Sequence, residues 1–367
     1  MKIECTQSNL HRGLSLVSRM VGTRTTLPVL ANILLKTEKG RLRLSATDLE
    51  IGISTYLGGK VDKEGQITLP ARLLYEFVST NTDDVVNLEL KGTDVILKSK
   101  HYTATIKGIE ASEFPAIPDI TPDFEAEVNT FDFRTAITQT VFAAALDETR
   151  PILSGVLIKI NGDELKMAAT DSFRLSEKTL RLNKKVEKKT EVVIPARTMV
   201  EMVRLLETGP ENMRLRIGEN QVAFTIGDVY MVSRILEGAF PDYEQIIPKD
   251  LPVKSSVQRE ELLGAMKMSA LFARDSANNI KVNISSKEIV ILAISPQMGE
   301  NKAKVNAQTT GGEIDISFNA RYILDALQAM TGKQTELYFA GKLSPCIIKD
   351  PADKSYLCIV MPLRVEN

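Results

Sequence analysis

The sequence predicts an α+β protein built from three copies of one unit of about 120 residues. Three observations lead to this fold class. A strand, an Ala-Arg pair and a helix recur together, certain strand ends recur with the same period, and proline clusters separate the copies. A unit of this length can bury a core of its own, unlike the short repeats of a solenoid. We therefore expect domains at residues 1–120, 125–248 and 252–367.

The clearest repeated element is a short apolar strand that runs through Ala-Arg into a helix. Its copies read ITLPARLLYEFV, VVIPARTMVEMV and ISFNARYILDAL, and they begin at Ile67, Val192 and Ile316. The arginines are separated by 125 and then 124 residues, and they are Arg72, Arg197 and Arg321. The same order and nearly the same spacing in each copy are hard to obtain by chance.

The second repeated element is a strand that ends in Thr-Asp, at Thr47-Asp48 and again at Thr170-Asp171. The third copy has Ile294-Ser295 in that place. Catalytic carboxylates would have to meet in one cleft, but these lie in different copies and the third copy lacks the acid. Thr and Asp side chains accept hydrogen bonds from nearby backbone amides, so we interpret the pair as a turn.

Further patterns complete the unit. An amphipathic helix is expected near the start of each copy, in SNLHRGLSLVSRMV, FDFRTAITQTVFAA and REELLGAMKMSALFAR, because apolar residues recur every three or four positions. Alternating apolar and polar residues predict paired strands, with hairpin turns at Lys91–Asp94 and Gly218–Asn220. Proline clusters near 115–123 and 241–252 interrupt backbone hydrogen bonding and mark the boundaries.

Composition narrows the class of protein. Hydrophobic residues make up 43% and charged residues 25%, an ordinary balance for a soluble domain protein. The net charge is −1, so a nucleic acid could be held only by a basic face segregated from the acidic residues. The start of the chain lacks an apolar signal region, and no apolar stretch approaches the ~20 residues of a membrane helix. We expect a cytoplasmic protein with no membrane partner.

The residues of catalytic and metal sites are scarce. Cys5, Cys346 and Cys358 lie in strand-like patterns and are expected to be buried thiols of a reducing compartment. His11 and His101 are not near a cluster with metal-ligand spacing. The sequence also lacks the common phosphate-binding and nucleophile motifs. We expect no enzymatic activity, no catalytic residues, no cofactor and no metal.

At this point specific strings carry a family resemblance. They are RTTLPVLANILL (Arg24–Leu35), SATDLEI (Ser45–Ile51), TRPILSGV (Thr149–Val156), ATDSFRLS (Ala169–Ser176), FPDY (Phe240–Tyr243) and VMPLR (Val360–Arg364). With the three copies, they resemble the beta subunits of bacterial DNA polymerase III over essentially the whole chain. That family comprises the beta sliding clamps, which are processivity factors in DNA replication.

The resemblance implies the DNA-clamp fold and a ring. Two chains would join head to tail, domain 1 of one against domain 3 of the other, to form six domains around duplex DNA. Helices would line the hole and sheets would lie outside. A head-to-tail contact that closes on itself yields a ring rather than a fibre. At the dimer interface the resemblance places Leu271 and Phe272, although packing in the core is an equal alternative.

Contacts to DNA should go to phosphates, because a clamp does not read sequence. The predicted helices carry basic residues, and acidic residues collect in strands and loops, which would give a basic hole in a neutral molecule. By resemblance, Arg24 also lies on a loop near DNA. The expected DNA-facing residues are Arg24, Arg72, Arg134, Arg197, Arg204, Lys267 and Arg321. Departures from relatives around Thr149–Ile152 leave the individual contacts there open.

The resemblance also implies a hydrophobic cleft between domains 2 and 3 that binds short motifs of DNA polymerases, the clamp loader and repair factors. Its apolar residues would hold leucine or aromatic anchors, and its arginines would rim it. A core position remains the alternative for Leu175, and Phe173 departs from relatives and would reshape one wall. The matching residues are Arg150, Leu153, Thr170, Ser172, Phe173, Arg174, Leu175, Pro241, Ile246, Leu343, Pro345, Ile359, Val360, Met361, Pro362, Leu363 and Arg364.

Two other functions remain open on the residues alone. A three-domain scaffold that binds peptides but not DNA would explain the cleft, although not the basic helices of every copy. An enzyme with a site assembled between domains would need converging polar groups, and the sequence offers none.

Overall fold

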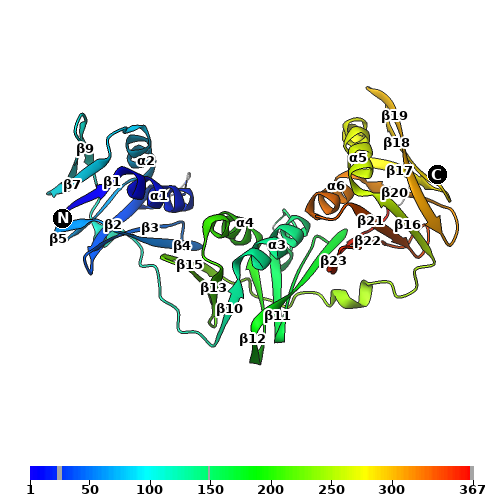
Figure 1. Ribbon diagram of the computed structural model, residues 1–367, viewed down its shortest axis with the longest axis horizontal. Helices are drawn as coiled ribbons and strands as arrows, with labels where there is room; N and C mark the ends of the chain where they lie inside the picture. Colours follow the sequence, from blue (N-terminus) through cyan, green and yellow to red (C-terminus); the bar gives the residue numbers. More distant parts are fainter. Residues whose placement is uncertain (23–26, 148, 364–367) are drawn as a thin grey trace. The chain divides into compact units, whose positions relative to one another are not determined.

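The computed structural model describes residues 1–22, 27–147 and 149–363, and its contacts divide the chain into two compact units (Figure 1). The first unit comprises residues 1–130 and 204–235, and the second comprises residues 131–203 and 236–367. The first repeat therefore lies in the first unit, the third repeat lies in the second unit, and the middle repeat contributes to both. Among the described residues, no helix is long and apolar enough to cross a membrane.

The first unit contains two antiparallel sheets. One has the order β5-β1-β7-β8-β9, with β1 at Lys2–Thr6, β5 at Lys60–Lys63, β7 at Val85–Lys91, β8 at Asp94–Lys98 and β9 at Thr103–Lys107. The other has the order β10-β13-β14-β15-β4-β3-β2-β6. Its strands are β2 (Asn32–Glu38), β3 (Arg41–Thr47), β4 (Ile51–Leu57), β6 (Gln66–Pro70), β10 (Phe124–Asn129), β13 (Asn212–Ile217), β14 (Gln221–Ile226) and β15 (Val229–Arg234).

Strand β15 of the second repeat pairs with β4 of the first, so one sheet is continuous across the junction of these repeats. Two helices belong to the first repeat, α1 (Gln7–Val17) and α2 (Ala71–Thr80), and they pack against each other. Helix α1 buries Leu10, Leu14 and Val17, which share one face because of the helical period. The Thr6 side chain caps this helix by accepting a hydrogen bond from the Asn9 amide at 3.3 Å.

The second unit is organised around a ten-stranded antiparallel sheet with the order β11-β12-β23-β22-β21-β16-β19-β18-β17-β20. Strand β12 of the second repeat pairs with β23 of the third, which repeats the arrangement of β4 and β15. The bounds are β11 (Gly155–Thr170), β12 (Arg174–Pro195), β16 (Val253–Gln258), β17 (Asn279–Ile284), β18 (Glu288–Ser295), β19 (Gly299–Thr310), β20 (Ile314–Asn319), β21 (Gln334–Phe339), β22 (Cys346–Asp350) and β23 (Asp353–Val360).

The remaining α-helices are α3 (Thr130–Thr140), α4 (Ala196–Leu205), α5 (Arg259–Ala273) and α6 (Ala320–Ala329). Helices α5 and α6 lie side by side, and α5 packs on β18 and β19 (Figure 1). The prediction of two helices in each repeat is therefore confirmed for the described part of the chain. The hairpins predicted at Lys91–Asp94 and Gly218–Asn220 are also present, between β7 and β8 and between β13 and β14.

The Thr-Asp pairs form the predicted turn, and the first two repeats build it with the same hydrogen bonds. The Thr47 hydroxyl donates to the Ile51 carbonyl at 2.9 Å, and the Thr170 hydroxyl donates to the Arg174 carbonyl at 2.7 Å. Asp48 Oδ1 and Asp171 Oδ1 each accept two backbone N–H bonds. In the third repeat Ser295 performs part of this task, because its hydroxyl accepts the amides of Gln297 and Met298.

The three cysteines are buried, as predicted. Burial raises the pKa of the Cys5 thiol to about 11 and that of the Cys358 thiol to about 12, so both remain protonated at neutral pH. His101 and the Asp83 carboxylate form a hydrogen bond with 2.6 Å between Nδ1 and Oδ1, and His11 stacks on Tyr75. Each histidine thus makes a specific contact with a neighbouring side chain.

Candidate functional site

The residues predicted for the peptide cleft gather where β12 pairs with β23 in the second unit. Leu153, Leu175 and Ile359 are buried together in one apolar cluster with Phe240 and Tyr243. Thr170 is buried in the Thr-Asp turn, and Val360 belongs to the core of the third repeat. These residues form the support beneath a surface rather than the surface itself, so the core interpretation of Leu175 is the one that the structure favours.

Apolar side chains are exposed above this support. Phe173 is 60% exposed and Leu343 is 75% exposed, and the Met361 amide donates to the Phe173 carbonyl at 2.8 Å. Large exposed apolar side chains in one region are typical of an interaction site. We call this region the β12–β23 surface, which consists of Phe173, Ile246, Leu343, Met361, Pro362 and Leu363.

The polar members of the predicted set have different environments. Arg150 lies beside the turn and donates from Nη1 to the Ser172 hydroxyl at 3.1 Å. Pro241 is exposed and Pro345 is half-buried. Arg364 lies outside the described residues. Of the three arginines expected to rim the cleft, Arg150 is therefore the one that the structure describes at the surface.

Arg174, also expected at the rim, is largely buried. Its side chain is only 8% exposed, and its guanidinium is held by Asp171 at 3.0 Å and by Asp325 at 2.5 Å. The ring of Tyr322 lies 4.5 Å from the guanidinium carbon, a cation–π distance. Asp325 and Tyr322 belong to α6, so Arg174 joins the second repeat to the third from inside.

A second buried polar group lies under the β12–β23 surface, and the sequence did not single it out. The Tyr243 hydroxyl donates to Glu177 at 2.5 Å, and Lys166 approaches the same carboxylate at 3.5 Å. Burial and the Glu177 carboxylate raise the pKa of Tyr243, so its hydroxyl keeps its proton. Lys178, next along β12, pairs with Asp353 of β23. The Tyr243–Glu177 hydrogen bond fixes the linker that follows Phe240 against the sheet, and the Lys178–Asp353 pair joins β12 to β23.

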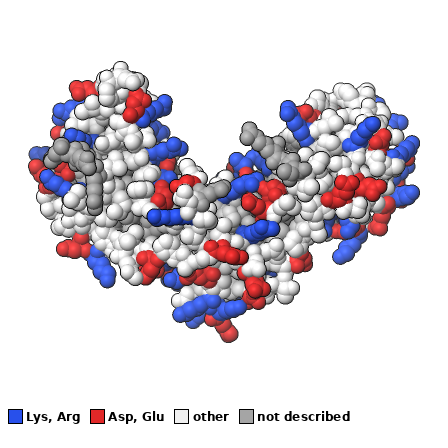
Figure 2. Space-filling view, turned by 180° about the vertical axis from the view of Figure 1, so that it is seen from behind, with Lys and Arg blue, Asp and Glu red and all other residues white. Residues whose placement is uncertain are grey.

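The residues predicted to face DNA lie on helices, apart from Arg24, which is outside the described residues. Arg72, Arg197, Arg204, Lys267 and Arg321 are exposed, and Arg134 is half-buried. Arg72 is paired with Glu76 one turn later on α2 at 2.8 Å, so part of its charge is neutralised locally. On the face drawn in Figure 2, basic side chains are interspersed with acidic ones, as expected for a net charge of −1.

The residues predicted for a dimer interface differ in exposure. Leu271 of α5 is 45% exposed, whereas Phe272 packs partly against the core of the third repeat. Met268 is exposed one turn before Leu271, and Ile294 and Met298 are exposed at the end of β18 and in the turn after it. Helix α5 packs on β18, and we call the exposed apolar residues of these neighbouring segments the α5 patch: Met268, Leu271, Ile294 and Met298.

The first repeat carries an open apolar pocket of about 330 Å³ beside α2. Leu73 and Tyr102 are exposed in its wall. We call it the α2 pocket, lined by Leu73, Glu76, Phe77, Thr80, Asn81 and Tyr102. Sequence reasoning missed both this pocket and most of the α5 patch. Their signal was the presence of large apolar residues at positions that the amphipathic period assigns to the exposed face of a helix.

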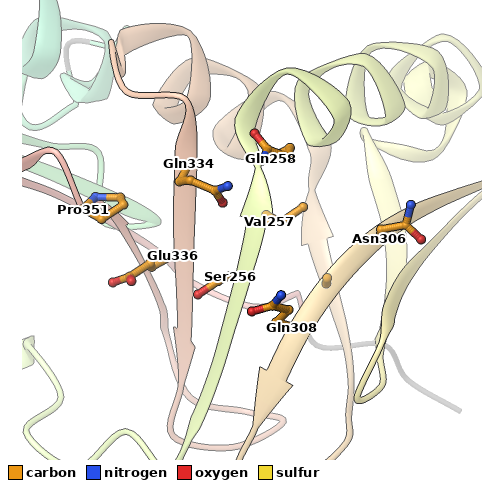
Figure 3. A pocket seen from close by; sticks show the side chains of 9 residues that line it. Ser256, Val257, Gln258, Asn306, Gln308, Gln334, Glu336 and Pro351 are labelled. Atoms are coloured by element: carbon orange, nitrogen blue, oxygen red, sulfur yellow. The ribbon is translucent and has the colours of Figure 1, made fainter.

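A pocket of about 580 Å³ on the third-repeat sheet is polar instead (Figure 3). Gln258, Gln308 and Gln334 project from β16, β19 and β21, which contribute its walls. Its carboxylate, Glu336, is engaged by Lys254 at 2.7 Å and by the Tyr338 hydroxyl at 2.5 Å. The glutamine and asparagine side chains of this pocket offer hydrogen bonds to a polar ligand.

Comparison with known proteins covers nearly the whole chain. Models of the N-terminal, central and C-terminal domains of the DNA polymerase III beta subunit match residues 1–118, 127–242 and 244–364. Beta sliding clamps of Staphylococcus epidermidis and Staphylococcus aureus are each 30% identical over 94% of both chains. The crystal structure of the Bacillus subtilis DNA polymerase sliding clamp superimposes with a TM-score of 0.95 at 30% identity, covering 100% of both chains. A Pseudomonas aeruginosa DNA polymerase III beta subunit gives a TM-score of 0.95 at 26% identity, also over 100% of both.

Proposed function

Because the chain belongs to the DNA polymerase III beta subunit family, the non-enzymatic sliding clamps that act as processivity factors in DNA replication, we propose that two copies close head to tail around duplex DNA. The three domains would be residues 1–120, 125–248 and 252–367. A scaffold that does not bind DNA is not favoured, because the relatives are sliding clamps over their full length.

The observation that carries the head-to-tail arrangement is a pair of unlike apolar surfaces. The α2 pocket belongs to the first repeat and the α5 patch belongs to the third. Leu271 projects from the patch, and Leu73 and Tyr102 line an open pocket of a size that admits such side chains. A contact between two different surfaces is heterologous, and with two copies it closes only as a ring with two interfaces of the same kind.

Complementary variants test this arrangement. Chains carrying Leu73→Asp would have a damaged α2 pocket and an intact α5 patch, and chains carrying Leu271→Asp would have the reverse. Each variant alone should be mostly monomeric in light scattering, near the chain mass of 40.6 kDa. An equimolar mixture should regain dimers, because the intact patch of the first variant meets the intact pocket of the second.

The same experiment separates the alternatives. A dimer made by like surfaces would join either two α2 pockets or two α5 patches. In the first case Leu271→Asp chains would still pair, and in the second case Leu73→Asp chains would still pair. The head-to-tail ring would therefore be contradicted if either variant alone dimerised with the same dissociation constant as the unaltered chain. A Phe131→Asp variant, with its exposed site on α3, is the matched control and should remain dimeric.

We further propose that retention on DNA comes from enclosure and that the helices contact phosphates without reading bases. Arg72, Arg134, Arg197, Arg204, Lys267 and Arg321 are the described candidates, and Arg24 is the candidate outside the described residues. Phosphate contacts weaken steeply with salt, so they alone would not retain the protein in concentrated salt. A closed ring adds a barrier to loss that does not depend on ionic attraction.

The β12–β23 surface is the proposed docking site for short motifs of DNA polymerases, the clamp loader and repair factors. Its exposed Phe173, Ile246 and Leu343 can cover apolar anchors, and the half-buried Met361 can adapt to their shape. Arg150, beside Ser172, is placed to contact a carbonyl or a carboxylate at the edge. Leu153, Leu175 and Ile359 support this surface from below, and Arg174 ties it to α6.

A further inference from the structure

The junction of the first and second repeats contains a pocket of about 340 Å³, entirely within the first unit. It lies where β4 pairs with β15. Its walls come from the Thr-Asp turn of the first repeat, from the proline-rich linker at residues 115–118 and from β14 and β15. We call it the junction pocket, and the lining residues that matter below are Leu49, Gly52, Pro115, Ile117, Val232 and Arg234.

The junction pocket occupies the position in repeats 1 and 2 that the β12–β23 surface occupies in repeats 2 and 3. The Arg234 amide donates to the Glu50 carbonyl at 3.2 Å, as the Met361 amide donates to the Phe173 carbonyl at 2.8 Å. Both pairs stand at the end of the strand that crosses the junction, next to a Thr-Asp turn. The linkers correspond as well, with Phe114-Pro115 in one and Phe240-Pro241 in the other.

Differences in side chains give the junction pocket its own shape. The second repeat has Leu175 where the first has Gly52. A Cβ at Gly52 would lie 3.0 Å from Ile117 Cγ2 and 3.2 Å from Val232 Cγ1, so these two side chains fill the space over the glycine. Val232 is buried, so the apolar surface that a ligand can contact comes from the exposed Leu49 and the half-buried Ile117.

The charge at the edge also differs. Arg234 is exposed where the third repeat has Met361, and within the described part of the chain no carboxylate forms an ion pair with it. An apolar wall beside a cationic side chain suits a ligand with an apolar group and a neighbouring carboxylate. The pocket volume falls in the range of sites that take a few side chains rather than a folded domain.

We propose that the junction pocket is a second docking site, for a short extended peptide with a leucine-sized side chain against Leu49 and Ile117 and an acidic residue beside Arg234. This inference rests on the proposed function, because it extends the docking of partner motifs from one junction of the repeats to the other. The requirement for an acidic residue would make the two sites select different motifs.

Photocrosslinking of the full chain tests the proposal. The probe is the capped tetrapeptide acetyl-Ala-photoleucine-Asp-Ala-amide, and mass spectrometry locates the attachment sites. Labelling is expected at Leu49 or Ile117. Arg234→Glu should reduce that labelling by about tenfold, as expected for loss of one charge pair. Circular dichroism of this variant should be unchanged, because Arg234 is exposed.

Matched reagents separate this proposal from the function on which it rests. Phe173→Asp should abolish labelling of the β12–β23 surface and leave labelling of the junction pocket unchanged. A probe with Asn in place of Asp should no longer label the junction pocket but should still label the β12–β23 surface. Labelling of the β12–β23 surface alone, or junction labelling that is insensitive to Arg234→Glu, would overturn the second site and leave the first intact. Absence of labelling at both would count against both.

Discussion

Leu49 and Ser172 occupy equivalent places in the Thr-Asp turns of the first and second repeats, and both have a left-handed backbone, with φ of 79° and 76°. Each amide donates to the hydroxyl of the preceding threonine at 3.1 Å. The same turn thus imposes the same backbone on two chemically unlike residues. At Leu49 a large side chain is also half-exposed, so the position is unfavourable in two respects.

Replacement of Leu49 by glycine should therefore stabilise the protein. The left-handed conformation costs a non-glycine residue about 1–2 kcal/mol of stability. Glycine removes this cost, but its greater flexibility in the unfolded chain offsets about half of the gain. Leu49→Gly should raise the midpoint of thermal unfolding, whereas Glu50→Gly, one residue later, should lower it or leave it unchanged. Equal effects of the two substitutions would show that Leu49 is not strained.

Arg174 should be essential to the stability of the second unit. Arg174→Met keeps an unbranched side chain but removes the guanidinium, which leaves Asp325 and Asp171 without their cation, and breaking such a buried pair costs about 3–5 kcal/mol. Asp325→Asn should cost less, because Asp171 still pairs with the arginine. Urea unfolding of the full chain measures both. A loss under about 1 kcal/mol for Arg174→Met would contradict this assignment.

The Thr-Asp turn and Arg174 show where sequence reasoning succeeded and where it could not. The turn is local, since Thr47 donates to a backbone carbonyl and Asp48 accepts from a backbone amide within four residues, so residue chemistry and spacing were enough to predict it. Arg174 meets Asp325 across 151 residues of sequence, and no local pattern indicates such a contact. The α2 pocket is a similar case, because Leu73 comes from a helix and Tyr102 from a separate loop. Strand alternation predicted the sheets but not their continuity across the repeats.

The helix arginines should contribute to DNA binding through phosphates alone. Arg197→Ala should weaken the affinity for duplex DNA equally for different sequences and reduce the slope of log affinity against log salt by about 1. Arg214→Ala is the matched control, because Arg214 is an exposed arginine on β13 that pairs with Glu125. Fluorescence anisotropy over a salt series measures the slopes. Equal losses for the two variants would argue against a special role of the helix face.

The β12–β23 surface should bind a short peptide taken from the replicative polymerase of the same organism. Phe173→Asp and Leu343→Asp each place a charge where an apolar anchor would lie, and each should weaken binding by about 30-fold, the effect of losing a hot spot of about 2 kcal/mol. Isothermal titration calorimetry measures the affinities, with Phe131→Asp as an exposed aromatic control on α3. Unchanged affinity in both surface variants would remove this surface from consideration.

The most direct measurement of the central claim is retention on circular and linear DNA of the same sequence. The protein is placed on nicked circular plasmid by a bacterial clamp loader with ATP and then filtered through a gel in concentrated salt, before and after a restriction enzyme cuts the plasmid. Enclosure predicts that the protein travels with the circle and leaves once the DNA has ends. Equal loss from both forms would show that ionic contacts, not a closed ring, hold the protein on DNA.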